Sequence, residues 1–269
     1  MKGLIIDCRP IQEGIKEEIR HDIETWGLLP ILTIIQVGDN GASNKYINQK
    51  IKHGEDVGIK VNLVKLPEST LEREVIEVIR NEQVKTDSII VQLPLPAHMD
   101  EQKVLDAIDP NKDVDCLTST NQGRLYNGNS PYYPCTPNGI VYIIEKLKPI
   151  RGLNILVVGR SNIVGKPLAQ MLTNKDATVT VAHSKTKNLD DLLMSGKFDV
   201  IVSAIGKPKC LKAKAEILID VGINKVSDGI CGDFDVENCQ YDYITPVPNG
   251  IGRMTVASLL VNILKSAMV

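Results

Sequence analysis

The sequence predicts an α/β protein with two α/β domains and a cleft between them, the second domain being a Rossmann-type, doubly wound parallel sheet. Two observations lead to this fold class. In the second half of the chain, an apolar strand runs into a glycine turn and a helix, and short strands and helices then alternate. The first half repeats the strand–helix order independently. A chain of 269 residues is long enough for two such domains.

The glycine turn follows an apolar strand at 155–158. Gly159 and Gly165 punctuate the turn, and Pro167 suits the first turn of a helix because its missing N–H has no helical partner there anyway. Free backbone N–H groups and the positive end of the helix dipole would then face an anion such as phosphate. The spacing is Gly-x-Ser-x-x-x-Gly and not Gly-x-Gly-x-x-Gly, so a helix-capping turn without a ligand is the alternative.

The remaining elements follow from apolar periodicity and from capping and turn residues. After the glycine turn we expect helices at 166–173 and 188–194 and strands at 177–182, 198–204 and 217–221. Before it we expect helices at 11–27, at 43–57 with Ser43 as the cap, from a capping box at 69–72 to 82, and at 136–147. The strands of that half are expected at 31–37, 61–64 and 88–93.

A final apolar helix at 254–267 would return to the first domain, and the helix at 136–147 would bridge the two domains. We therefore assign residues 1–138 and 253–269 to one domain and residues 139–252 to a second, Rossmann-type domain.

Composition narrows the class of protein. Apolar residues make up 43% of the chain and charged residues 24%, with a net charge of −2, as in soluble globular proteins that do not bind nucleic acid. No run approaches the roughly 18 apolar residues of a membrane span. The N-terminus lacks a signal-peptide core. Six cysteines show neither Cys-x-x-Cys nor zinc-type spacing, so we expect no metal site, reduced thiols and a cytoplasmic location.

The residues after the second strand of the Rossmann domain favour NADP over NAD. An NAD site has an acidic residue about 20 positions after the glycines, which bonds the ribose 2′-hydroxyl. This chain has Ser184 and Lys185 near that place, and Arg160 lies inside the glycine turn. Basic and hydroxyl groups suit a 2′-phosphate. The alternative is that both cations are ordinary surface charges.

Candidate catalytic residues lie in the first domain. Tyr46 and Lys50 are four positions apart and share a helix face with apolar neighbours, so Lys50 is a candidate for acid–base chemistry. The alternative is a lysine that extends to solvent beside a packed tyrosine. Gln92 ends a strand, where α/β sheets expose ligand contacts. Asp113 and Asp115 are turn residues or, functionally, acceptors for the amino and ring N–H groups of a heterocycle. The Pro/Gly loop at 244–255 either lines a site or connects two elements.

Read together, these segments resemble the bifunctional methylenetetrahydrofolate dehydrogenase/cyclohydrolase family along nearly the whole chain. The resemblance rests on several long motifs in the same order: Ser43–Lys50, Val91–Pro96, Lys112–Asp115, Pro134–Pro137, Val158–Pro167, His183–Thr186, Ile219–Asn224 and Thr245–Pro248. It implies oxidation of 5,10-methylenetetrahydrofolate by NADP to the methenyl form, followed by hydrolysis to 10-formyltetrahydrofolate. It also implies a homodimer, and it makes residues 1–138 and 253–269 the catalytic, folate-binding domain and residues 139–252 the NADP-binding Rossmann domain.

The same resemblance implies roles for particular residues. Lys50 would be the general acid/base of hydrolysis, Tyr46 would orient and stack on the pterin, Gln92 would bond Lys50, and Asp115 would hold the pterin amino edge. The catalytic set is thus Lys50, Tyr46, Gln92 and Asp115. The substrate-binding set adds Val91, Leu93, Pro248, Asn249, Gly250, Ile251 and Gly252, and the cofactor-binding set is Gly159, Arg160, Ser161, Ser184 and Ile223.

Three positions depart from the family pattern. Cys116 and Leu117 stand where the family has Gly-Phe after the aspartate, which affects packing of the pterin pocket. Asn249 replaces a glycine of the Pro-Gly-Gly-Val-Gly-Pro loop, but asparagine tolerates positive φ, so the loop shape can survive. Arg253 replaces the final proline, and we expect it to add charge and loosen the turn.

Other functions remain compatible with the sequence. One is a different two-domain NADP dehydrogenase, such as a shikimate-type enzyme acting on a hydroxy acid. A second is a folate- or nucleotide-binding protein without turnover, and a third is a dehydrogenase that lacks the hydrolase activity.

Overall fold

The computed structural model describes residues 3–227 and 229–269, which form two compact units. One unit comprises residues 3–13 and 135–255, and the other comprises residues 14–134 and 256–269. The first residues belong with the Rossmann-type unit because strand β1 (Leu4–Ile5) pairs in parallel with β11 (Tyr243–Ile244). This placement differs from the predicted assignment of residues 1–138 to one domain.

The unit of residues 14–134 and 256–269 is built on a three-stranded parallel sheet. Its strand order is β3-β2-β4, so the two outer strands flank β2 (Ile31–Val37) on opposite sides. Such an order reversal leaves a crevice at the carboxyl ends of the central strand and its neighbour, the usual ligand site of α/β sheets. The other elements are α2 (Gly41–Glu55), β3 (Lys60–Leu66), α3 (Glu72–Glu82), β4 (Ser88–Val91), α4 (Glu101–Leu105) and α5 (Ser119–Tyr126).

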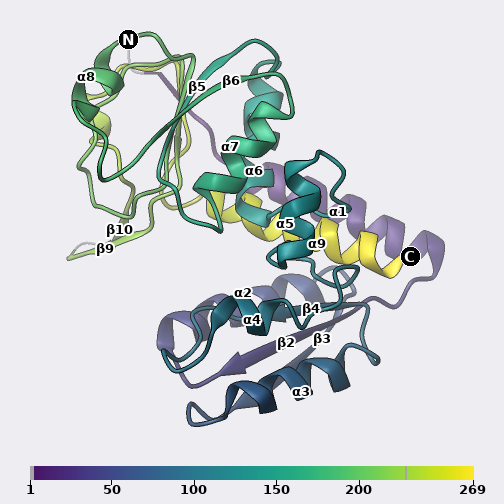
Figure 1. Ribbon diagram of the computed structural model, residues 1–269. Helices are drawn as coiled ribbons and strands as arrows, with labels where there is room; N and C mark the ends of the chain where they lie inside the picture. The colour runs from purple at the N-terminus through teal and green to yellow at the C-terminus, as the bar shows by residue number, and fades with distance from the viewer. Residues whose placement is uncertain (1–2, 228) are drawn as a thin grey trace. The chain divides into compact units, whose positions relative to one another are not determined.

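Both faces of this sheet are covered. Figure 1 shows α2 and α3 on opposite sides of the strands. Ile35 of β2 and Ile89 of β4 are fully buried against Val75 and Ile79 of α3. On the other side, a Cβ at Gly54 of α2 would lie 2.9 Å from Val61 Cγ2, so this helix packs closely on β3. Burial on both faces explains why β2 reads as a continuous apolar run.

The unit of residues 3–13 and 135–255 contains a six-stranded sheet with the order β1-β11-β8-β7-β5-β6, in which all pairings are parallel. Chain order reverses at β5 and β7, and the carboxyl ends of such a strand pair are the usual ligand site of α/β sheets. The elements are α1 (Arg9–Trp26, shared with the other unit), α6 (Cys135–Leu147), β5 (Asn154–Val158), α7 (Gly165–Thr173), β6 (Thr178–Ala182), α8 (Leu189–Met194), β7 (Val200–Ser203), β8 (Ile217–Asp220), the hairpin β9 (Asn224–Val226) and β10 (Gly229–Cys231), and the start of α9 (Ile251–Ala267).

Two predicted helix caps are wrong. Helix α2 begins at Gly41, where the Asn40 side chain accepts the Ser43 N–H at 3.3 Å. Ser43 is instead buried and donates its hydroxyl to the Leu93 carbonyl at 3.4 Å. Helix α3 begins at Glu72, and Glu74 accepts the Leu71 N–H at 2.9 Å. Several cap-forming residues lie within three positions of each start, and tertiary contacts decide which of them is used.

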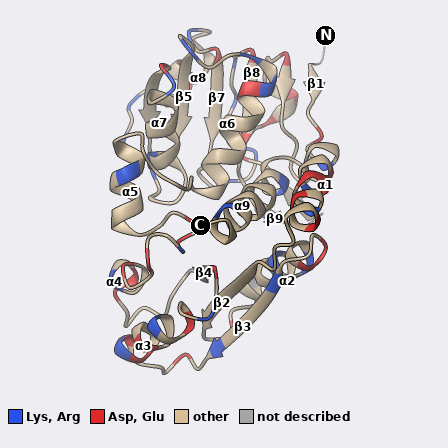
Figure 2. Cartoon of the chain, turned by 90° about the vertical axis from the view of Figure 1, so that its right-hand side faces the viewer, with Lys and Arg blue, Asp and Glu red and all other residues tan. Residues whose placement is uncertain are grey.

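Charge is mixed over the surface. Figure 2 shows acidic and basic residues side by side along α1 and α3. Among the described residues, none of the helices combines the length and apolarity that a membrane span requires.

Two buried carboxylates accept hydrogen bonds from the chain that follows β7 and β8 in the Rossmann-type sheet. Asp233 is fully buried and accepts hydrogen bonds from Ser203 Oγ, the N–H groups of Ile205, Gly206 and Lys207, and Asn224 Nδ2 at 2.8–3.3 Å. Asp220 accepts the N–H groups of Gly222, Asp233 and Phe234, each at 3.0 Å. Burial raises the pKa of Asp220 to about 6, and the nearby Asp233 carboxylate adds to the rise against the opposing backbone hydrogen bonds.

The raised pKa of Asp220 gives a pH dependence of stability with a defined sign. The folded chain binds this proton below about pH 6, whereas the unfolded chain binds it only near the ordinary value of 3.8. The contribution of Asp220 to the free energy of unfolding is therefore fully present below pH 3.8 and is lost as pH rises through 6. Urea unfolding of the parent and of Asp220→Asn should show the parent gaining relative stability from pH 6 towards pH 4, by up to about 1.4 kcal/mol per pH unit. A stability difference independent of pH would contradict the raised pKa.

Candidate active site

Lys50 and Gln92 meet at the carboxyl edge of the three-stranded sheet. Gln92 follows β4 directly, and its backbone N–H continues the ladder to the Ile35 carbonyl at 2.8 Å. Its side-chain Nε2 donates to the Leu93 carbonyl at 2.8 Å, so its Oε1 is left to accept from Lys50 Nζ at 3.4 Å. The Ser43 hydroxyl donates to the same Leu93 carbonyl and ties α2 to this strand end. Lys50 is therefore positioned by its own helix and by the end of β4.

Asp115 joins the pair from a third segment. An isolated parallel bridge between Ile89 and Asp113 brings this segment beside β4. Asp115 Oδ2 then lies 3.6 Å from Lys50 Nζ, with the two side chains 22% and 18% exposed. The sequence indicated a role for Asp115 in ligand binding, but it gave no sign of this ion pair, because the two residues are far apart along the chain. The distances from Lys50 to both partners exceed the usual 2.7–3.2 Å of a hydrogen bond.

Asp113 shapes the turn that presents Asp115. Its buried carboxylate accepts the N–H groups of Leu117 and Thr118 at 3.0 and 2.9 Å and Asn121 Nδ2 at 3.0 Å. Burial raises the pKa of Asp113 against these hydrogen bonds. The side chain of Asn262 in α9 supports the same turn by donating to the Val114 carbonyl at 2.9 Å. The sequence carried no signal for Asn262, since it lies within an apolar helix far along the chain.

Cys116 preserves the turn although it replaces a glycine of the family pattern. Its φ of +57° lies in the left-handed region that favours glycine, and its side chain is fully buried. Burial raises the pKa of its thiol to about 12, so the group stays protonated at neutral pH. Leu117 packs against the apolar core of the sheet. Both substitutions therefore fit the local packing.

The other predicted substrate-binding residues of this unit lie around Lys50. Tyr46 is one helical turn before it and is 46% exposed, so its ring is available to a ligand. The side chain of Val91 is buried in the core, so only its backbone can contact a ligand at the carboxyl edge of the sheet. Leu93 is partly buried, and its carbonyl accepts the two hydrogen bonds described above.

The glycine turn of the Rossmann-type unit requires its glycines. Gly159 has a φ of +131°, and a Cβ there would lie 2.6 Å from the Ala204 carbonyl oxygen. A Cβ at Gly165 would lie 2.2 Å from the carbonyl oxygen of Gly159. Both contacts are with backbone atoms, which cannot move aside. The turn is thus as tight as the phosphate turn of dinucleotide-binding sheets, at the switch point between β5 and β7.

One expectation for this turn is wrong in detail. The N–H groups at the start of α7 are not all free for an anion, because Ser161 accepts several of them. Its hydroxyl accepts the N–H groups of Val164 and Gly165 at 3.2 and 3.4 Å, and its carbonyl accepts that of Lys166 at 3.1 Å. Ser161 therefore supports the turn, and an anion would meet the residues that precede these donors.

The residues expected at the ends of a dinucleotide are placed at this sheet edge. Arg160, Ser184 and Lys185 are exposed, and the Ser184–Lys185 turn is closed by a hydrogen bond from the Thr186 N–H to the His183 carbonyl at 2.8 Å. Ile223 follows β8 and is 50% exposed. The turn after β6 carries no carboxylate, as the sequence indicated.

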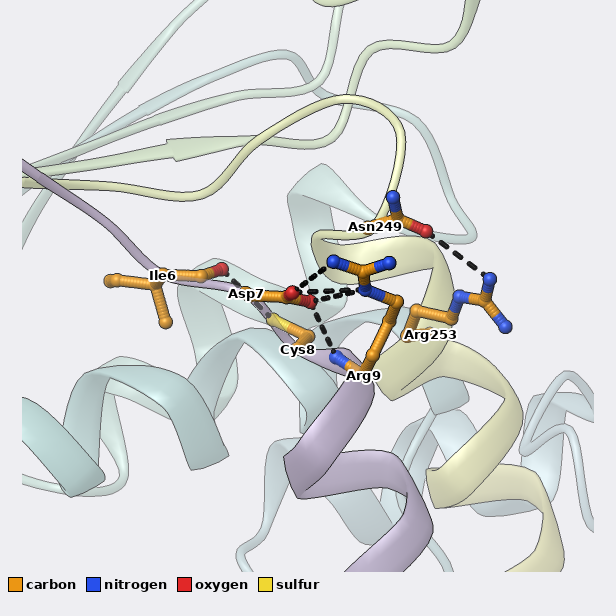
Figure 3. A network of polar contacts seen from close by, with 6 residues as sticks. All are labelled: Ile6, Asp7, Cys8, Arg9, Asn249 and Arg253. Carbon is orange, nitrogen blue, oxygen red and sulfur yellow. Dashed lines mark hydrogen bonds and ion pairs between the residues drawn. The ribbon is translucent and has the colours of Figure 1, made fainter.

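The predicted substrate loop is held by the N-terminal segment. The Cys8 N–H donates to the Asn249 carbonyl at 3.0 Å, and Asn249 has a φ of +76°, the conformation for which asparagine was expected to be tolerated. Pro248 and Gly252 are exposed, whereas Gly250 and Ile251 are buried. Nearby, Arg9 binds the Asp7 carboxylate at 2.6 Å and lowers the pKa of Asp7 (Figure 3).

Arg253 does not loosen this loop, contrary to the expectation. Its guanidinium donates to Asn249 Oδ1 at 3.2 Å and to Gln12 Oε1 at 3.4 Å (Figure 3 shows the first contact). The arginine thus links the loop to α1, and it supplies the anchoring that a proline would supply by restricting the backbone.

Comparison with known proteins gives the family. Residues 6–115 match the model of the tetrahydrofolate dehydrogenase/cyclohydrolase catalytic domain. Residues 134–269 match the model of the tetrahydrofolate dehydrogenase/cyclohydrolase NAD(P)-binding domain.

Relatives and solved structures agree over the full length. The bifunctional protein FolD of Campylobacter hominis is 44% identical, covering 98% of this chain and 96% of the relative, and that of Bacillus cytotoxicus is 41% identical over 99% and 97%. The crystal structure of the FolD methylenetetrahydrofolate dehydrogenase/cyclohydrolase of Campylobacter jejuni has a TM-score of 0.94 at 37% identity, covering 98% of both chains. FolD of Trypanosoma brucei, complexed with NADP cofactor and inhibitor, has a TM-score of 0.92 at 33% identity, covering 100% of this chain and 98% of the other.

A shikimate dehydrogenase in complex with NADP+ shares only the fold, with a TM-score of 0.51 at 12% identity over 89% of this chain and 94% of that one. The chain therefore belongs to the tetrahydrofolate dehydrogenase/cyclohydrolase family and carries both its catalytic and its NAD(P)-binding domain.

Proposed function

We propose that this protein oxidises 5,10-methylenetetrahydrofolate to 5,10-methenyltetrahydrofolate with NADP+ and hydrolyses the product to 10-formyltetrahydrofolate. The observation that carries the proposal is the meeting of Lys50, Gln92 and Asp115 at one sheet edge within a chain of this family. The folate chemistry belongs to the unit of residues 14–134 and 256–269, and the cofactor belongs to the other unit.

The oxidation needs alignment more than acid–base catalysis. A folate nitrogen lone pair assists departure of the hydride from the methylene carbon, so the protein mainly has to hold the carbon in place. Tyr46, with its exposed ring, stacks on the pterin, and Asp115 accepts hydrogen bonds from the pterin amino edge. Residues 91–93 at the end of β4 are further substrate contacts in this unit, and the family resemblance adds the loop from Pro248 to Gly252.

The hydrolysis needs a proton acceptor. Water adds to the cationic methenyl carbon, the bond from that carbon to one folate nitrogen breaks, one proton of the water ends on that nitrogen, and the other proton has to leave. Lys50 is the group placed for this transfer, and the Gln92 oxygen at 3.4 Å orients its Nζ. Asp115 serves both Lys50 and the pterin, since its carboxylate faces Lys50 and is only partly buried.

The glycine turn fits NADP. Gly159 and Gly165 leave a surface that a Cβ would fill, which suits close approach of a pyrophosphate. Ser161 would contact the pyrophosphate, Arg160 and Ser184 would lie near the 2′-phosphate, and Ile223 would lie near the nicotinamide end. When bound, NADP+ supplies the hydride acceptor.

We further propose a homodimer in the cytoplasm that supplies a formyl donor to purine biosynthesis. The family resemblance supports the dimer, and exposed Val226 and Ile230 of the β9–β10 hairpin offer apolar surface for it. The six cysteines are all free thiols, which supports a reducing compartment.

Lys50→Met should separate the two activities. The apolar methionine side chain keeps most of the packing, while the general base is lost, at a typical cost of about 10²–10⁴-fold in rate. We expect the variant to form NADPH and to accumulate methenyltetrahydrofolate. Absorbance of both products is followed from methylenetetrahydrofolate and NADP, with Lys52→Met, an exposed neighbour on the same helix, as the control. Hydrolysis by Lys50→Met at the parent's enzymic rate would exclude the proposed role.

Arg160→Ala should reduce the preference for NADP. A charge-assisted contact with the 2′-phosphate contributes about 1.5–3 kcal/mol, so kcat/KM for NADP should fall by roughly 10–150-fold. The value for NAD should change little, because NAD lacks that phosphate. Steady-state kinetics with both cofactors measure the ratio, and Lys166→Ala on the same turn is the control. The assignment fails if the parent has the same kcat/KM for NAD as for NADP, or if the variant loses kcat/KM equally for both cofactors.

A further inference from the structure

The segment that follows β7 is held by the side chain of Asp233 and not by a β-ladder. Residues 204–207 have no regular secondary structure, yet three of their N–H groups bond the Asp233 carboxylate. Gly206 in this segment has a φ of +67°. Without Asp233, the N–H groups of Ile205, Gly206 and Lys207 would lose the acceptor that defines the path of this segment.

The same carboxylate reaches the segment after β8. Asp233 Oδ1 accepts Asn224 Nδ2 at 2.9 Å, and Asn224 is buried directly after Ile223. The approach requires two glycines. A Cβ at Gly222 would lie 2.1 Å from Asp233 Oδ1, and one at Gly232 would lie 2.0 Å from Asp220 Oδ2. Asp220 in turn accepts the Asp233 N–H and so fixes the residue that carries the carboxylate.

The segment at 204–207 lies at the switch point of the sheet, and the segment at 222–224 follows the neighbouring strand β8. Ala204 follows β7, and its carbonyl oxygen occupies the space beside Gly159 at the end of β5. A ligand that extends from the glycine turn across this edge therefore meets residues 204–207 and then Ile223. The two side chains that donate to Asp233 come from Ser203 at the end of β7 and from Asn224.

We infer that Asp233, braced by Asp220, is a positioning residue for the nicotinamide half of NADP. It orders the segments at 204–207 and 222–224 before the cofactor arrives, so that binding does not have to order them. The inference rests on the proposed function, in which Gly159 and Ile223 lie along the cofactor. A carboxylate suits five donors because both of its oxygens accept, whereas an asparagine would turn an N–H₂ group towards one set of donors.

The test compares two cofactor fragments on the full-length Asp233→Asn variant. We expect KM for NADP to rise by tenfold or more. Binding of adenosine 2′,5′-bisphosphate, which carries the adenosine and the 2′-phosphate without nicotinamide, should stay within twofold of the parent. Hydrolysis of methenyltetrahydrofolate supplied directly, which consumes no NADP, should proceed at the parent rate. Glu237→Gln, an exposed carboxylate four residues away, is the matched control and should match the parent in every assay.

Three results would overturn the inference: an unchanged KM for NADP, equal weakening of NADP and of the bisphosphate, or a parallel loss of hydrolysis. If Asp233→Asn does not fold, Asn224→Ala removes one donor and leaves the carboxylate in place. This variant should raise KM for NADP by a smaller factor and leave binding of the bisphosphate unaffected. An equal loss of binding for NADP and for the bisphosphate would again exclude the role. Failure of the proposed function is distinguishable, because the parent itself would then not reduce NADP.

Discussion

The order reversal of two parallel sheets is the constraint from which both candidate sites follow. Parallel strands are joined by crossovers, so their carboxyl ends meet at one edge. Where strand order reverses, at β2 and β4 in one sheet and at β5 and β7 in the other, the connections leave that edge in opposite directions. Lys50 and Gln92 lie after the first pair of strands, and Gly159 and Ala204 lie after the second. Residues more than 40 positions apart thus become neighbours.

In each unit a buried carboxylate stabilises the irregular chain at this edge. Asp113 accepts two N–H groups and an amide and presents Asp115 to Lys50. Asp233 does the same for the segment after β7. A buried carboxylate is costly unless its oxygens are fully bonded, and the backbone N–H groups of a loop are equally costly if they remain unpaired. Hydrogen bonds between the carboxylate and these N–H groups offset both costs, so the loops acquire one defined conformation without a β-ladder.

Local features could be predicted from the sequence. The alternation of strands and helices, the glycines of the turn and the tolerance of Asn249 for positive φ depend on neighbouring residues, and the structure has all three. Both cap predictions, at Ser43 and at Ser69, were wrong because nearby residues can also cap the start of the helix. The support that Arg253 gives to its loop was also missed, since its partner Gln12 lies at the other end of the chain.

Long-range partners could not be predicted. Nothing in the sequence pairs Lys50 with Asp115, or Asp220 with Asp233, because such contacts depend on how the strands are ordered in the sheet. The placement of β1 beside β11 was missed for the same reason, as a two-residue strand has no periodicity to detect. The resemblance to a family predicts the site residues, and the structure brings three of them, Lys50, Gln92 and Asp115, together at one sheet edge.

In the proposed function, hydride transfer and hydrolysis are separate steps, the first served by alignment and the second by Lys50. The most direct test is a single turnover with methylenetetrahydrofolate that carries deuterium on the methylene carbon. NADPH formation and the later decay of methenyltetrahydrofolate are followed separately. The account predicts a primary isotope effect on NADPH formation and none on the decay. An equal slowing of both, with no methenyl intermediate, would contradict it.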